Sequence, residues 1–87
     1  MKYHVELTKK AVKQLRKIPR ETQIRIFRGI RLLENSETWG DVKVLVNHTY
    51  SHRLRIGNYR VLFDVLPEGI VQVVLVGAIK KRDGRTY

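Results

Sequence analysis

The feature that most constrains the fold is the pair Gly57-Asn58, which separates two runs of alternating apolar and polar residues. Glycine tolerates positive φ, and a two-residue loop with glycine first is typical of a type II′ β-hairpin turn. The flanking runs, residues 50–56 and 59–66, are rich in β-branched, aliphatic and aromatic side chains. A third run, residues 70–79, follows a Pro-Glu-Gly break. The second half of the chain is therefore predicted to form three antiparallel strands.

The first half of the chain predicts one short strand followed by two helices. Residues 3–7 alternate apolar and polar side chains, as a half-buried strand does. Thr8 is a suitable N-cap for a helix that runs to about residue 17, and Pro19 ends this helix and opens a second one over residues 20–34. Residues 35–40 are expected to form a loop that Trp39 pins to the core. Residues 41–46 fit either a short strand or an irregular lead-in.

This order of elements, β-α-α-β-β-β, predicts an α+β domain in which two helices pack on one small antiparallel sheet. The 87 residues contain no linker or repeat, so we expect residues 1–87 to form a single domain. The second helix is expected to bury one apolar stripe, formed by Ile26, Phe27, Ile30 and Leu33. Its other side carries arginines beside Ile24 and Leu32, and it is either a docking face or a solvated surface.

The charge balance predicts an anionic partner. The chain has 18 Lys and Arg against 8 Asp and Glu, a formal net charge of +10, spread over both halves. Such a balance suits nucleic acid, an anionic membrane or an acidic protein, although solvated surface charge is the plainer alternative. The hydrophobic fraction of 43% argues against disorder. The longest apolar run is half the length needed to span a bilayer, and no leader opens the chain, so a cytoplasmic protein without a membrane partner is expected.

The hairpin register predicts a cluster of cations on one face of the sheet. With Gly57-Asn58 as the turn, Arg55 lies opposite Arg60, and alternation puts Arg53 on the same face. Like charges directly opposite each other destabilise a sheet by about 0.2–1 kcal/mol. The arrangement is reasonable if an anion sits between the guanidinium groups, because their planar forks match phosphate oxygens. A local salt-bridge network around Asp64 is the alternative.

Several kinds of active site are absent from the sequence. There is no glycine-rich phosphate loop, no HExxH pair and no nucleophile elbow. The carboxylates lack the spacing of a two-metal site, and the absence of cysteine removes thiol nucleophiles and Cys-ligated zinc, so we expect no metal and no cofactor. His52 falls on the predicted core face, where a hydrogen-bonded structural role is expected. His48, in a loop, is a minor acid–base candidate.

Residues 50–65, "YSHRLRIGNYRVLFDV", resemble the RelE/ParE superfamily of bacterial and archaeal toxins. The shared pattern is a basic strand that ends in Arg, then Val or Ile, then Gly. One variable residue follows, and after it come Tyr-Arg and three apolar or aromatic residues. The similarity extends over nearly the whole chain. It includes "KKAVKQLRKIP" as the first helix and "LVG" before a basic segment and a late tyrosine.

The resemblance to the RelE branch implies a toxin that cuts mRNA in the ribosomal A site, without metal, through attack of the RNA 2′-hydroxyl on the adjacent phosphate. It also implies a cognate antitoxin and a toxin–antitoxin hetero-oligomer. Ser51 stands where the family has a lysine, and Lys80, Lys81 and Arg82 compete for the basic position after the last strand. The positions that match the family site are Arg53, Arg55, Arg60 and Tyr87. We take Arg53, Arg60, Arg82 and Tyr87 as catalytic candidates, and Arg55, Lys80, Lys81 and Arg85 as phosphate-binding candidates.

Two other functions remain open on the sequence alone. A ParE-like toxin shares the fold and much of the hairpin motif, and it would inhibit DNA gyrase without cutting RNA. A non-catalytic RNA-binding module would use the same basic face only to hold phosphate. Binding in all three cases would weaken steeply with salt, so salt dependence does not separate them.

Overall fold

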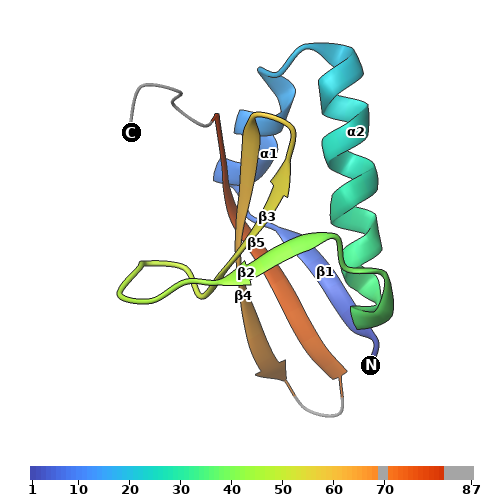
Figure 1. Ribbon diagram of the computed structural model, residues 1–87, viewed down its shortest axis with the longest axis vertical. Helices are drawn as coiled ribbons and strands as arrows, with labels where there is room; N and C mark the ends of the chain where they lie inside the picture. Colours follow the sequence, from blue (N-terminus) through green and yellow to red (C-terminus); the bar gives the residue numbers. More distant parts are fainter. Residues whose placement is uncertain (69–70, 82–87) are drawn as a thin grey trace.

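The computed structural model describes residues 1–68 and 71–81, which form a five-stranded sheet covered by two helices (Figure 1). The strands lie in the order β1-β5-β4-β3-β2, so β5 is flanked by β1 and β4 and the two sheet edges are β1 and β2. In chain order the elements are β1 (Tyr3–Leu7), α1 (Lys9–Arg16), α2 (Arg20–Arg31), the 3-10 turns η1 (Leu32–Glu34) and η2 (Ser36–Thr38), β2 (Asp41–Val44), β3 (His52–Ile56), β4 (Tyr59–Glu68) and β5 (Val71–Lys81).

The sheet confirms the α+β class and differs from the expected sheet in two respects. The first strand runs parallel to β5, with Val5 beside Val74, so the sheet is mixed. Residues 41–44 form a fifth strand, which settles the ambiguous segment before the hairpin. Local alternation identifies strands but carries no direction for strands that no hairpin joins. The chain between β1 and its neighbour β5 contains both helices and three strands, so only the tertiary structure sets that pairing.

Side chains at the predicted helix ends account for where the helices begin. The hydroxyl of Thr8 accepts a hydrogen bond from the Ala11 backbone N–H at 3.1 Å and donates one to the Gly77 carbonyl at 3.1 Å. The predicted cap therefore also ties α1 to β5. Pro19 precedes α2 as expected. The α-helix itself ends at Arg31, and the last predicted turn is the tighter η1.

Both helices bury their apolar sides against the same face of the sheet. Ala11 and Leu15 of α1, together with Ile26 and Ile30 of α2, belong to the core, as do six residues of the strands: Leu54, Val61, Phe63, Val74, Val76 and Ile79. Trp39 packs edge-on against Phe63, with ring centroids 5.7 Å apart, as the expected pin. The other face of the sheet carries no helix (Figure 1).

One expected core residue is exposed. Phe27 retains 46% of its accessible surface, whereas Ile26, Ile30 and Leu33 are buried. The buried residues are spaced i, i+4 and i+7 and form one stripe, from which Phe27 is rotated by about 100°. It lies instead in a shallow groove beside Ile24 and Leu15, between the helices.

No helix in the described part of the chain is long and apolar enough to cross a membrane.

The two phenylalanines are expected to differ sharply in their contribution to stability. Phe63 is fully buried, so Phe63→Ala should lower the free energy of unfolding by about 3–5 kcal/mol through lost burial and a cavity. The matched change Phe27→Ala should cost about 1 kcal/mol or less, because nearly half of the ring is already exposed. Urea denaturation followed by circular dichroism measures both values. Equal losses would contradict the assignment of Phe63 to the core.

Candidate functional site

The hairpin formed by β3 and β4 has the register that the sequence predicts. Arg55 lies opposite Arg60, and Arg53 lies opposite Leu62. Gly57 has a φ of +56°, whereas Asn58 has no positive φ, which is the pattern of a type II′ turn. Because the core residues Leu54 and Val61 face the helices, alternation places the three arginines on the helix-free face.

The next strand adds a further cation to this face. Lys80 of β5 pairs with Arg60, so Arg55, Arg60 and Lys80 form one row across three neighbouring strands. Adjacent strands lie about 4.8 Å apart, so the backbones that carry these side chains are close neighbours. Arg53 lies two residues from Arg55 along β3 and faces the same side. We refer to Arg53, Arg55, Arg60 and Lys80 as the basic face.

Arg60 occupies the centre of the row and has an unpaired polar atom. Its Nε is buried and has no hydrogen-bond partner among the described residues. A buried donor left without a partner costs about 1–3 kcal/mol, and here the neighbours opposite it on both sides are also cations. Folding alone does not account for this arrangement. An anion bound at Arg60 would supply the missing acceptor and separate the like charges.

The acidic residue that contacts this cation cluster is Asp41, and the described residues show no salt bridge to Asp64. Asp41 of β2 lies opposite Arg55 and contacts Arg53, whose Nη1 is 3.0 Å from the Asp41 carbonyl oxygen and 3.3 Å from its Oδ1. The Asp64 carboxylate instead accepts a hydrogen bond from the Ser51 backbone N–H at 2.8 Å and so holds the loop that leads into β3. The alternative of a salt-bridge network around Asp64 is therefore not found among the described residues.

The site candidates predicted to follow the last strand take different positions, and two of them, Lys80 and Lys81, lie within β5. Lys80 belongs to the basic face. Lys81 pairs with Tyr59, whose side chain packs against the core, so alternation puts Lys81 on the opposite face of β5. The other candidates, Arg82, Arg85 and Tyr87, lie outside the described residues. Their proximity to the basic face stays a prediction.

Sequence reasoning missed three residues near the basic face. Lys43 and Asp41 lie on β2, opposite Arg53 and Arg55 respectively, and the ambiguity of that strand hid them. Tyr50 lies over Gly77, where an added Cβ would come within 2.8 Å of the tyrosine hydroxyl. An isolated glycine inside a strand signals a bulge or a close approach, so Gly77 was the available clue.

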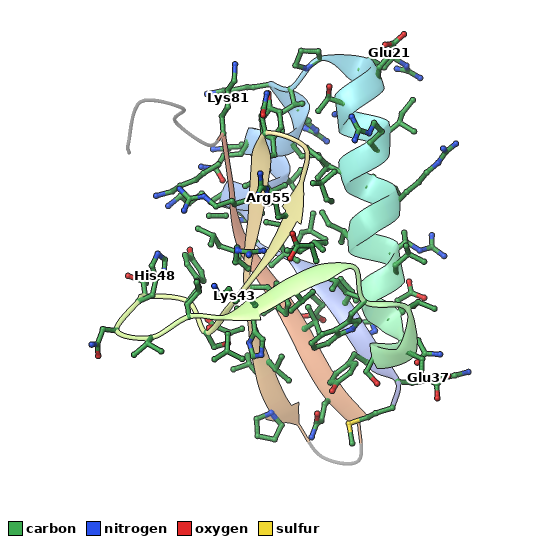
Figure 2. The ribbon with its side chains drawn as sticks, in the orientation of Figure 1. Glu21, Glu37, Lys43, His48, Arg55 and Lys81 are labelled. Carbon is green, nitrogen blue, oxygen red and sulfur yellow. The ribbon has the colours of Figure 1, made fainter. Side chains whose placement is uncertain are left out.

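The structure supports the predicted role of His52, and that of His48 stays a prediction. His52 stacks on Phe63 with ring centroids 5.2 Å apart and hydrogen-bonds the Ser51 hydroxyl at 2.7 Å, which confirms a structural role. His48 is exposed in the loop before β3, on the side of the sheet away from α2 (Figure 2). Among the described residues no three His, Asp or Glu side chains cluster as metal ligands would.

Removal of the Asp41 charge should strengthen anion binding at the basic face. Asp41→Asn releases Arg53 from a carboxylate contact that is partly exposed to solvent, so the expected gain is no more than about five-fold in affinity for inorganic polyphosphate. Glu37→Gln changes the net charge equally but lies near the end of α2 remote from the hairpin turn (Figure 2), and it should leave the affinity unchanged. Isothermal titration calorimetry at low salt measures both. Equal gains would mean that only net charge matters.

The structure is similar to three solved toxin–antitoxin complexes. A chain of the archaeal RelE–RelB complex from Pyrococcus horikoshii OT3 matches with a TM-score of 0.76 and 28% identity, covering 99% of this chain and 100% of that one. A chain of the RelBE2 complex from Mycobacterium tuberculosis matches with a TM-score of 0.76 and 21% identity over 94% and 100%. A chain of the RelB–RelE complex from Methanococcus jannaschii matches with a TM-score of 0.67 and 23% identity over 86% and 87%.

The sequence comparison agrees with the structural one at the level of the superfamily. No curated protein matches the chain. The family model of the ParE toxin of type II toxin–antitoxin systems matches residues 5–82, which includes both helices, the hairpin and the basic face. The chain therefore belongs to the ParE toxin family of type II toxin–antitoxin systems, within the RelE/ParE superfamily.

Proposed function

We propose that this toxin is a ribosome-dependent mRNA endonuclease that stops translation by cutting mRNA in the ribosomal A site. The observation that carries the proposal is the buried, unpaired Nε of Arg60, set between Arg55 and Lys80 on the helix-free face. A phosphate group would supply the missing acceptor and match the planar guanidinium groups around it, although a carboxylate of a protein partner could also reach this atom.

The basic face suits cleavage by the neighbouring 2′-hydroxyl. Attack of the 2′-oxygen on phosphorus forms a phosphorane that carries extra negative charge, and the bond to the 5′-oxygen then breaks to leave a 2′,3′-cyclic phosphate. Arg53, Arg55 and Arg60 would hold the phosphate and stabilise that charge without any metal. Lys80 lies in the same row, near the end of β5, and we favour it over Lys81 for the family's late basic position because Lys81 is on the opposite face.

The proton transfers fall to other groups. Arginine stays protonated in proteins and cannot serve as a base. We assign removal of the 2′-proton, or stacking on a base, to Tyr87. Arg82 is assigned to stabilise the negative charge on the leaving 5′-oxygen, which then takes a proton from solvent water, and Arg85 is an additional phosphate contact. Ser51 replaces the lysine found in related sites, and its hydroxyl is already engaged with His52 and the Phe63 carbonyl.

A cognate antitoxin is the second expected partner. The structural neighbours are toxins in complex with antitoxins, and we propose that this chain forms a corresponding hetero-oligomer in the cytoplasm. An acidic segment that orders on binding could cover the basic face. The exposed Ile24 of α2 and Leu32 of η1, at 42% and 48% exposure, offer apolar anchors for a partner elsewhere on the molecule.

Inhibition of DNA gyrase is the alternative function, because the matching family model is the one for ParE. Purified toxin should be added both to an in vitro translation reaction, with mapping of mRNA ends, and to a gyrase supercoiling reaction. Cuts confined to translated mRNA would support the endonuclease. Gyrase inhibition without cuts would support the alternative, and neither effect would favour a non-catalytic RNA-binding module.

Arg60→Ala should reduce the cleavage rate by about 100-fold or more, because it removes a charge placed at the developing phosphorane. The rate is measured in a single turnover at saturating toxin with mRNA bound to ribosomes. Arg16→Ala removes the same charge from an exposed position on α1 and should leave this rate unchanged. Cleavage by Arg60→Ala at the rate of the unsubstituted protein would refute the assignment.

Tyr87→Phe separates the two roles assigned to the late tyrosine. Loss of the hydroxyl removes a proton acceptor but keeps the ring, so base duty predicts a fall in the single-turnover rate of roughly 100-fold. Stacking alone predicts a rate close to that of the unsubstituted toxin, with the loss appearing only in Tyr87→Ala. Unchanged rates in both variants would exclude Tyr87 from the site.

A further inference from the structure

Tyr50 is seated on the helix-free face by the absence of a side chain at Gly77. A Cβ added to Gly77 would overlap Cε1 of the Tyr50 ring and come within 2.8 Å of both Cζ and Oη. The register between β4 and β5 shifts at this point, with Leu62 opposite Ala78 and Phe63 opposite Val76, so Gly77 is the extra residue of a bulge. The bulge and the glycine together form a notch for the ring.

The notch adjoins the basic face. Ala78, the next residue of β5, pairs with Leu62, and Leu62 pairs with Arg53. Lys80 follows two residues later on the same face, about 7 Å along the strand. The ring of Tyr50 therefore lies over the strand that carries Lys80, at a point three residues before it.

The backbone on both sides of Tyr50 is held in place. The Tyr50 N–H donates to Nδ1 of His48 at 3.1 Å, and the Ser51 N–H donates to the Asp64 carboxylate at 2.8 Å. The Leu45 N–H donates to the Ser51 carbonyl at 2.8 Å and closes the base of the loop. The carboxylate nearest the loop is thus used to position Tyr50 and not to neutralise the arginines.

The ring remains partly accessible and has an aromatic neighbour. Tyr50 is half-buried, and the exposed ring of His48 lies 6.3 Å from it at a tilt of 38°. Proteins that hold single-stranded nucleic acid combine cations for the phosphates with aromatic rings on which bases stack. A fixed, half-exposed ring beside four cations has this combination.

We propose that Tyr50 is a stacking platform for the RNA base next to the phosphate held by the basic face. The proposal rests on the endonuclease function in that the ligand is single-stranded RNA. It assigns to the loop before β3 a contact with the nucleobase, whereas the basic face contacts only the backbone. Tyr50 is here a substrate-binding residue and takes no part in proton transfer.

Binding of short RNA strands tests the proposal. The probe is a fluorescent single-stranded RNA with 2′-O-methyl groups, which block cleavage, and a set of the same strands with one nucleotide at a time made abasic. Fluorescence anisotropy at low salt gives the affinities. Stacking predicts that Tyr50→Leu weakens binding of the intact strand by about 5- to 100-fold, while Tyr50→Phe stays within two-fold of the unsubstituted protein.

The abasic strands distinguish stacking from a purely structural role. At one position the abasic change should weaken binding by the unsubstituted protein and cause no further loss in Tyr50→Leu. Arg60→Ala should weaken binding of intact and abasic strands equally, because it removes a phosphate contact. An unsubstituted protein that binds all strands equally, or none, overturns the proposal, as does a Tyr50→Leu loss that is the same for every abasic strand.

A second variant tests the seat of the ring. Gly77→Ala should displace Tyr50 and reproduce the loss seen in Tyr50→Leu, with little added loss when the two are combined. Gly40→Ala is the matched control, since its Cβ would meet only Leu54 Cδ1 at an ordinary 3.5 Å. If Gly77→Ala does not fold, Tyr50→Leu alone carries the test. Base-dependent RNA binding without mRNA cleavage would refute the endonuclease function but support stacking by Tyr50. Cleavage of mRNA without base-dependent binding would refute only the stacking role of Tyr50.

Discussion

The register of the β3–β4 hairpin is the constraint on which the basic face depends. Leu54 and Val61 must face the helices, because a slip of one residue would expose both to water and bury charged groups. Once these apolar residues are placed, Arg55 and Arg60 have to meet on the other face. Burial of the core residues therefore holds Arg55 and Arg60 opposite each other, although the repulsion between their charges disfavours this pairing. The cation cluster is thus held together by the burial of residues on the opposite face of the sheet.

The two faces of the sheet consequently differ in composition and in their contribution to the energy of the fold. The helix-covered face contains the main core, centred on residues such as Phe63 and Val74, while Leu62 and Ala78 are buried on the other face. The helix-free face carries the electrostatic strain, relieved in the described residues by Asp41 and left unrelieved at the Nε of Arg60. Residues that the fold holds in an energetically unfavourable arrangement are the ones from which function is best inferred. In this protein they are Arg55 and Arg60.

The bulge at Gly77 of β5 affects the shape of the helix-free face. A perfectly paired β5 would place a side chain where the Tyr50 ring lies, and only the bulge with Gly77 leaves the space. Asp64 completes the arrangement by holding the neighbouring loop through a backbone hydrogen bond. Gly77 and Asp64 thus determine where the Tyr50 ring lies on this face, while the regular pairing of the strands determines where the cations lie.

The sequence by itself determined the hairpin, both helices with the Thr8 cap, and the convergence of the three arginines, because each follows from local periodicity or a turn of known geometry. It also indicated the superfamily through the residues around that turn. Only the tertiary structure decided the parallel pairing of β1 with β5, the entry of Lys80 into the row, the exposure of Phe27 and the seat of Tyr50. These depend on contacts between segments far apart in the chain, for which neighbouring residues carry no signal.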